Sequence, residues 1–102
     1  MFIIMWEFTV QPDHVSAFEK AYGKNGQWGE LFRKYPGYVK TELLKEASGT
    51  GRYMTCDYWS TEQDSQVFKD AQDPDYAALD KRFEALTVRE QFIGNFLVVT
   101  CS

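Results

Sequence analysis

The sequence predicts one α+β domain in which helices cover one face of a four-stranded antiparallel sheet. A chain of 102 residues and 11.9 kDa has room for one hydrophobic core, so we treat residues 1–102 as a single domain. Apolar residues alternate with a period of two in four segments and recur at helical spacing between them. The resulting order of strand, helix, strand, strand, helix pair and strand is the split, ferredoxin-like β-α-β-β-α-β plan.

The first strand and the first helical region lie in the N-terminal third of the chain. Residues 2–10 are rich in β-branched and aromatic side chains, and both of their faces begin apolar, which is typical of a strand covered on both sides. Residues 11–13 end this strand and begin a helix. Helical spacing over residues 15–22 is interrupted by glycines and resumes over residues 28–35.

The second and third strands form a predicted hairpin. Residues 38–45 and 52–59 have strand patterns, and the glycine-rich residues 47–51 between them favour a flexible turn.

Two short helices and a final strand complete the fold. Ser60, with Gln63 three residues later, indicates a helix start, and Asp73-Pro74 ends that helix and begins the next. The apolar side of the second helix consists of Tyr76, Leu79, Phe83 and Leu86. Residues 92–100 form an apolar run that we predict to be a strand buried on both faces.

Helices on one face of the sheet leave the opposite face bare. Many residues of that face are apolar or aromatic, and a monomer rarely exposes so large an apolar patch. A second copy of the chain is the simplest cover. We therefore expect a homodimer.

Charge and cysteine content exclude several classes of partner. Eleven Lys and Arg against fifteen Asp and Glu give a net charge of −4 without a basic cluster, so nucleic acid is not expected. The apolar start ends at Glu7, far short of the roughly 20 residues that span a bilayer, so a membrane is not expected either. Cys56 and Cys101 form no disulfide framework, and we interpret them as reduced thiols of a cytoplasmic protein.

The sequence lacks the motifs of common cofactor and nucleophile sites. His14 is the single histidine, which excludes a two-histidine metal site within one chain. There is no GxGxxG motif, no GxSxG motif and no cysteine near a histidine in the sequence. We therefore expect no metal and no cofactor.

Candidate chemistry lies on the third strand. Tyr53, Thr55, Asp57 and Trp59 alternate and so share one face. A carboxylate among aromatic side chains can have a raised pKa and serve as a general base, which points to Asp57 and to Glu7 on the first strand. The alternative is that these carboxylates lie at strand ends or in salt bridges at a dimer contact.

Three stretches of the chain resemble the antibiotic biosynthesis monooxygenase family of dimeric α/β-barrel proteins. They are VQPDHVSAFEKAY, LFRKYPGYVKTELL and GRYMTCDYWSTEQDSQVFK, of which the last, a strand ending in Trp before a Ser/Thr/Glu-rich helix start, is the most recognisable. The resemblance covers residues 2–100. It implies two protomers that pack sheet to sheet into a barrel, each with a pocket between helices and sheet. Some members oxidise phenolic or quinol-type compounds with O₂ and neither metal nor flavin, others bind and degrade haem, and many have no known activity.

The resemblance carries over one pocket residue by its position. Trp59 matches the pocket tryptophan of both active groups. Haem-degrading members have an asparagine where Trp6 stands and a histidine on the later helix, whereas residues 73–86 contain no histidine. Cofactor-free oxygenases use an asparagine and an arginine beside the tryptophan, and Arg82 is the nearest candidate for that arginine.

The first class of function that follows is a cofactor-independent monooxygenase acting on a small phenolic or quinol-type compound. Asp57 or Tyr53 would transfer the proton, and Trp59 would form an aromatic wall. The candidate substrate-binding residues are Trp59, Trp6, Phe83 and Arg82.

The second class is a non-catalytic ligand-binding or structural dimer on the same fold, and a different reaction such as isomerisation stays open. A closed pocket that holds Asp57 or Tyr53 beside Trp59 would favour the oxygenase. A pocket filled by the chain's own side chains would favour the alternative.

Overall fold

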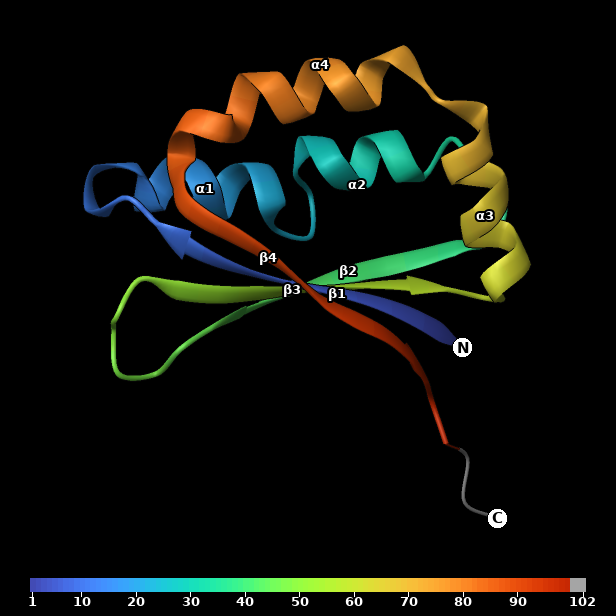
Figure 1. The fold of residues 1–102 in the computed structure, drawn as a ribbon, viewed down its shortest axis with the longest axis horizontal. Coiled ribbons are helices and arrows are strands. Elements are labelled where there is room, and N and C mark those ends of the chain that lie inside the picture. Colours follow the sequence, from blue (N-terminus) through green and yellow to red (C-terminus); the bar gives the residue numbers. More distant parts are fainter. Residues whose placement is uncertain (100–102) are drawn as a thin grey trace.

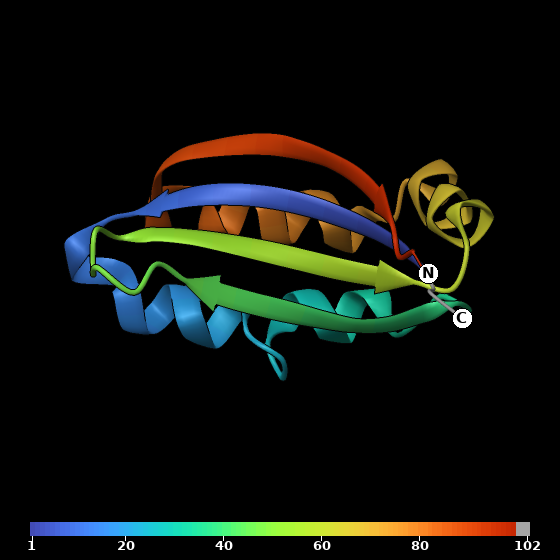
Figure 2. The ribbon, with the colours of Figure 1, turned by 90° about the horizontal axis from the view of Figure 1, so that it is seen from below.

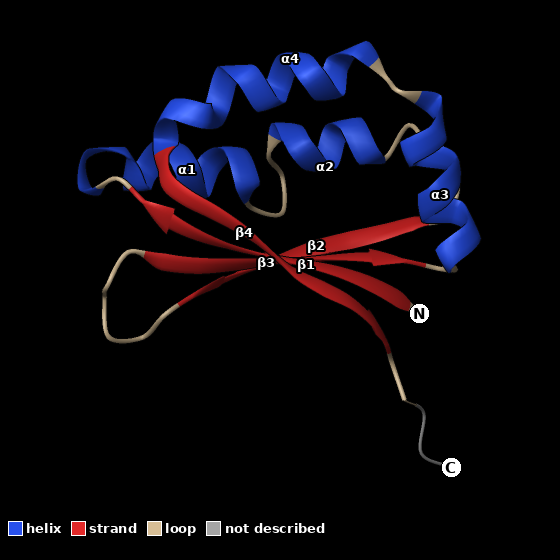
Figure 3. Cartoon of the chain, in the orientation of Figure 1, coloured by secondary structure: helices blue, strands red, loops and turns tan. Residues whose placement is uncertain are grey.

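The structure is a computed structural model that describes residues 1–99 (Figures 1 and 3). Its strands are β1 (Phe2–Val10), β2 (Tyr38–Lys45), β3 (Arg52–Trp59) and β4 (Thr87–Leu97). Its helices are α1 (Val15–Tyr22), α2 (Gln27–Phe32), α3 (Glu62–Ala71) and α4 (Pro74–Phe83), with short 3-10 turns at Pro12–His14 and Glu84–Leu86. Cys101, one of the two expected free thiols, lies outside the described residues.

The four strands form one antiparallel sheet in the order β2-β3-β1-β4. The helices cover one face only, with α1 and α2 behind β2 and β3, and α4 behind β1 and β4 (Figure 2). This arrangement confirms the predicted α+β, ferredoxin-like protomer.

The first helical region divides into α1 and α2 at a close approach between two backbone segments. A Cβ atom on Gly26 would lie 2.1 Å from the carbonyl oxygen of Ala21, so only glycine allows the chain to turn back so tightly there. The turn lets the second helix bring Trp28, Leu31 and Phe32 down onto the sheet.

Aromatic rings fill the space between the helices and the sheet. Phe8 of β1 packs against Phe18 and Tyr22 of α1, and these two rings stack with centroids 4.3 Å apart. At the other end of the sheet, Phe68 of α3 lies edge-on to Phe32. The high aromatic content of the chain is therefore used mainly in one continuous core under the helices.

The fourth strand differs from its prediction in both extent and burial. β4 begins at Thr87, five residues before the expected start at Phe92, and ends at Leu97. The expected burial on both faces is wrong for the single chain, because Phe92 is 48% exposed and Leu97 is 72% exposed. The physical reason is position, since β4 is an edge strand that pairs with β1 alone.

The sheet face opposite the helices carries both apolar and charged side chains. Met5 and Met54 lie near its centre, while Lys40 lies over the ring of Tyr58. Glu7 forms an ion pair with Arg52 at one end, which corresponds to the salt-bridge alternative for this carboxylate.

Candidate functional site

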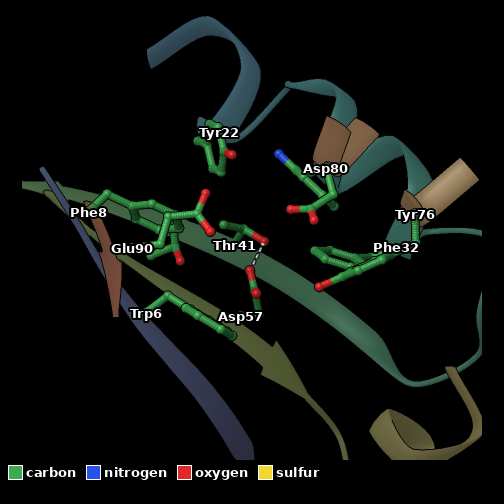
Figure 4. Close-up of a pocket in the computed structure, with 11 residues that line it drawn as sticks. Trp6, Phe8, Tyr22, Phe32, Thr41, Asp57, Tyr76, Asp80 and Glu90 are labelled. Carbon is green, nitrogen blue, oxygen red and sulfur yellow. Dashed lines mark hydrogen bonds between the residues drawn. The ribbon is translucent and has the colours of Figure 1, made fainter. Parts of the chain in front are cut away.

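Two neighbouring cavities lie between the helices and the covered face of the sheet. The first, which we call the acidic cavity, has a volume of about 180 Å³ (Figure 4). It is lined by the carboxylates Asp57, Asp80 and Glu90, by the hydroxyl groups of Tyr22, Thr41, Thr55 and Tyr76, and by Trp6, Phe8, Trp28 and Phe32.

The second, which we call the apolar cavity, has a volume of about 490 Å³. It shares Trp6, Phe32, Asp57 and Tyr76 with the acidic cavity and adds the set Ile4, Trp59, Phe68, Lys69, Gln72, Asp73, Ala77 and Phe92. Its volume lies within the range of about 300–1,000 Å³ that is usual for small-molecule sites.

Asp57 lies where the two cavities meet. Its strand position on β3 turns the carboxylate toward the helices, and the Thr41 hydroxyl of the neighbouring strand donates a hydrogen bond of 2.7 Å to it. The Thr41 hydroxyl also lies 2.7 Å from that of Tyr38, so the three side chains form a chain of hydrogen bonds that fixes the carboxylate. The arrangement orients Asp57 without neutralising it.

Burial raises the pKa of Asp57 to about 6, although the hydrogen bond from Thr41 lowers it in part. Within residues 1–99, the ion pairs of the structure involve other carboxylates, so no cation compensates this charge. A carboxyl group with a pKa of about 6 is mostly ionised at neutral pH and is a stronger base than an exposed aspartate. These are the properties of a general base.

Two further carboxylates reach the acidic cavity from other elements. Figure 4 shows Asp80 of α4 and Glu90 of β4 on either side of the space above Asp57. Burial and the nearby charge of Asp80 raise the pKa of Glu90. Burial, followed by the charge of Glu90, also raises the pKa of Tyr22. The cavity therefore has a concentrated negative charge.

Two tryptophans form walls of the apolar cavity. Trp59 is only 1% exposed and packs edge-on against Phe32 and Tyr38. Trp6 meets Phe92 of β4 edge-on, with centroids 5.4 Å apart. The structure thus brings three of the sequence-predicted residues, Asp57, Trp59 and Trp6, to one cavity.

Tyr53 shares a strand face with Asp57 but does not line either cavity. It is buried beneath α1, where its hydroxyl donates a hydrogen bond to Glu19, and burial and this bond raise its pKa to about 12. Six residues of extended strand, roughly 20 Å, separate it from Trp59. A shared face therefore does not imply a shared site.

Arg82 and Phe83 also lie outside the two cavities. Phe83 is buried at the C-terminal end of α4 next to Tyr22, and Arg82 is exposed with its guanidinium 5.3 Å from the Phe83 ring. Helical phase explains Arg82, which lies on a different side of α4 from Tyr76 and Asp80. Phe83 shares their side of the helix but lies about two turns beyond Tyr76, past the end of both cavities.

Sequence reasoning missed Trp28, Thr41, Asp80 and Glu90. The position of Glu90 had a usable signal, because a strand starting before Phe92 would place both residues on one face. The sequence has no such signal for Asp80 and Trp28, because their approach to the acidic cavity depends on how α2 and α4 pack across the sheet.

Comparison with known proteins now places the fold in a family. The family model of antibiotic biosynthesis monooxygenases matches residues 1–78. The chain belongs to the antibiotic biosynthesis monooxygenase family. No curated protein matches it in sequence.

Solved structures similar to this family member show the same fold at low sequence identity. A protein from Bordetella bronchiseptica that carries the family's name is 19% identical, with a TM-score of 0.77 and 97% of each chain covered. SnoaB, a cofactor-independent oxygenase from Streptomyces nogalater, is 18% identical, with a TM-score of 0.68, over 98% of this chain and 94% of SnoaB.

A further similar structure is that of an MhuD variant, which has two manganese protoporphyrin IX molecules bound per active site. It is 16% identical to this chain, with a TM-score of 0.71. The match covers 100% of this chain and 98% of MhuD. The family fold therefore accompanies both cofactor-independent oxygenation and porphyrin binding.

The donor set of the two cavities does not fit haem. No histidine, cysteine or methionine lines either cavity, and the described part of the chain contains no group of three residues able to hold a metal ion. Within the described residues, the acidic cavity contains three carboxylates and no cationic side chain, a charge that is unfavourable for the anionic propionates of haem. Furthermore, none of the helices over residues 1–99 has the length and hydropathy to cross a membrane.

Proposed function

We propose that this protein is a cofactor-independent monooxygenase that oxidises a small phenolic or quinol-type compound with O₂. The observation that carries the proposal is the position of Asp57, an uncompensated carboxylate with a pKa of about 6, in one cavity with Trp59 and Trp6. A base beside a flat aromatic surface can deprotonate a phenol and orient its ring.

In the proposed reaction, the Asp57 carboxylate accepts the hydroxyl proton of the phenol. The phenolate gives one electron to O₂, and the phenoxyl radical and superoxide combine to form a carbon–oxygen bond on the ring. The peroxide takes the proton back from Asp57 and, as the ring hydrogen leaves and the O–O bond breaks, releases water and a quinone. One phenol and one O₂ give one quinone and one water, so the substrate supplies every electron.

The pKa of Asp57 restricts the kind of phenol. A simple phenol has a pKa of about 10, so proton transfer to a carboxylate of pKa about 6 is uphill by about four units. A phenol or quinol conjugated to a carbonyl group is more acidic, which reduces this barrier. We therefore expect carbonyl-conjugated phenols to react fastest.

The walls of the apolar cavity support the reaction by binding the ring and excluding water. Trp59 and Phe92 present aromatic surface to a flat substrate, and each such contact contributes about 1 kcal/mol. Exclusion of water prolongs the life of the radical pair and prevents loss of superoxide.

The direct test is O₂ uptake by metal-free protein with a panel of carbonyl-conjugated phenols. Asp57→Asn should lower the rate at least about 100-fold, the usual contribution of a general base. Asp70→Asn is the matched control, because Asp70 is an exposed carboxylate of α3 outside both cavities. Equal loss in both variants, or none in Asp57→Asn, would refute the role of Asp57.

The burial of Trp59 favours a second candidate, a non-catalytic binding protein. A side chain only 1% exposed and packed on several rings contributes to the core whether or not the cavity performs chemistry. Tight binding of phenols without O₂ uptake would support this candidate.

We also propose that the protein works as a homodimer, the association that would cover the bare sheet face. Support comes from Phe96, which pairs with Ile3 on the bare face and is 45% exposed on an edge strand of the single chain.

A further inference from the structure

The acidic cavity contains three carboxylates and no cationic side chain. Asp57, Asp80 and Glu90 come from β3, α4 and β4, and no lysine, arginine or histidine is among the residues that line this cavity. Figure 4 shows their carboxylates around one space, between Tyr22 and Trp6. Lysine reaches only the neighbouring apolar cavity, at Lys69.

The negative charge of this cavity is not neutralised by the protein. The ion pairs found within residues 1–99 use other carboxylates, and Asp57 receives a hydrogen bond only from the hydroxyl of Thr41. Tyr76 lies within the field of all three carboxylates, each of which contributes, after burial, to its raised pKa. A cation entering this space would meet favourable charge from three sides.

The walls of the acidic cavity suit a cation equally well. Aromatic faces attract ammonium groups through their negative quadrupole, and Trp28 and Tyr76 meet edge-on with ring centroids 5.4 Å apart. Carboxylates together with aromatic walls are the combination by which proteins recognise organic ammonium ions rather than metal ions.

An independent observation indicates a ligand in this cavity. Trp28 lines it and is only 8% exposed, and its indole N–H lies close enough to the Tyr22 hydroxyl to lower the pKa of that group in part, yet it completes no hydrogen bond of normal geometry. A buried donor without an acceptor is costly, and native proteins rarely keep one. An oxygen atom of a ligand would satisfy it.

We propose that the acidic cavity binds a protonated amine of the substrate, with an oxygen atom next to that amine accepting the Trp28 N–H. This inference rests on the proposed function and narrows its substrate class to phenols that have an aliphatic amine. The two cavities meet at Asp57, so the aromatic ring occupies the apolar cavity while the ammonium group lies between Asp80 and Glu90. The ammonium charge also offsets the carboxylates that would otherwise oppose phenolate formation at Asp57.

The test is calorimetric binding of three probes that share one hydroxyphenyl group: tyramine, which is cationic, tyrosol, which is neutral, and para-hydroxyphenylacetate, which is anionic. Tyramine should bind at least about tenfold more tightly than the anion, with tyrosol between them. Asp80→Asn and Glu90→Gln should each reduce this ratio about two- to fivefold, and added salt should reduce it further. Glu30→Gln, an exposed carboxylate of α2 outside both cavities, should leave the ratio unchanged.

The role of Trp28 has its own comparison. Octopamine is tyramine with an added hydroxyl group on the carbon atom next to the one that carries the amine. It should bind the wild-type protein more tightly than tyramine, and Trp28→Phe, which keeps a ring but removes the N–H, should abolish that difference.

The outcomes separate this inference from the proposed function. Equal affinity for the three probes, tighter binding of the anion, or a preference that survives in both Asp80→Asn and Glu90→Gln would overturn the inference, whatever the O₂ uptake with other phenols. A preference for tyramine that disappears in those variants would support it even if no phenol caused O₂ uptake, in which case only the oxygenase proposal would fail.

Discussion

Asp57, the proposed general base, also affects the stability of the protein. An ordinary aspartate has a pKa of 3.8, and burial raises the pKa of Asp57 to about 6, so the folded chain holds this proton more tightly than the unfolded chain. Ionisation of Asp57 therefore opposes folding, and stability falls as the pH rises through the interval from about 4 to about 6.

Asp57→Asn should make the protein more stable at neutral pH. Asparagine keeps an oxygen that can accept the hydrogen bond from Thr41, and it removes the buried charge. A pKa raised from 3.8 to about 6 corresponds to a gain of up to about 3 kcal/mol at pH 7, and to almost none below pH about 4. Urea unfolding at the two pH values measures both quantities. A variant that is less stable than the wild type at pH 7 would show that Asp57 has a compensating partner.

Trp59 is part of the core and has a proposed second role in ligand binding, which a pair of variants can separate. Trp59→Phe should lower the free energy of unfolding by about 1–3 kcal/mol, because this side chain is 1% exposed, and should also weaken phenol binding. Phe83→Leu, at a buried position outside both cavities, should lower stability with binding unchanged. Thermal unfolding beside calorimetric binding gives both readouts. If Trp59→Phe binds phenols as tightly as the wild type does, Trp59 contributes to the core and not to ligand binding.

The strand pattern predicted part of the site for a physical reason. Period-two alternation places Asp57 and Trp59 on the same face two residues apart. The pairing of β1 with β3 places Trp6 opposite Thr55, diagonal to Asp57. The same alternation included Tyr53, which is too far along β3 to reach the cavity. Convergence of Asp80 on Asp57 depends on helix packing, which local patterns do not encode.

At the scale of elements, the junction between α2 and α4 holds the rim of the apolar cavity. Asp73 caps α4 by accepting the backbone N–H of Asp75 at 2.9 Å, and it also accepts a 2.7 Å hydrogen bond from Tyr35 and pairs with Lys34 at 2.8 Å. These bonds hold the pKa of Asp73 low, at about 2, with the contact to Lys34 as the largest cause.

Asp73→Ala should lower the melting temperature by roughly 4–8 °C, the effect of losing a helix cap in a domain of this size. Because the pKa of Asp73 is depressed from 3.8, its contribution is present above pH about 4 and is lost as the pH falls toward 2. The difference in melting temperature between variant and wild type should therefore disappear in acid. A difference that is constant with pH would mean that charge at Asp73 does not matter.

Element boundaries followed from the sequence wherever turn chemistry marked them. The Asp73-Pro74 step separates α3 from α4, and the glycines before Gln27 separate α1 from α2, as predicted. The start of β4 was missed because Thr87 and Val88 directly continue the turn that ends α4, without glycine or proline between them. Its exposure could not be predicted from apolar composition, since composition does not show which strand lies at an edge.

At the scale of the whole molecule, the bare sheet face and the edge strand determine the expected assembly. The protein should sediment with about twice its 11.9 kDa chain mass at micromolar concentration, and its interface should bury well over about 1,000 Å². Phe96→Glu should shift the protein to monomer, because this ring is 45% exposed in the single chain and pairs with Ile3 on the bare face.

Val67→Glu is the control for that variant. Val67 is 49% exposed, but it lies on α3, which is beside one end of the sheet and not on the bare face (Figures 1 and 2). Sedimentation velocity should show a dimer for this control and a monomer for Phe96→Glu. A wild-type protein that is monomeric at micromolar concentration would contradict the barrel.

We propose that Asp57 starts an oxygenation that needs only a phenol and O₂. The measurement that tests it most directly is turnover of a carbonyl-conjugated phenol under heavy-isotope O₂, with metal-free wild-type protein and with Asp57→Asn. We expect one labelled oxygen atom in the quinone and the other in water for the wild type, and a rate lower by at least about 100-fold for the variant. An unlabelled product, or equal rates with the two proteins, would contradict it.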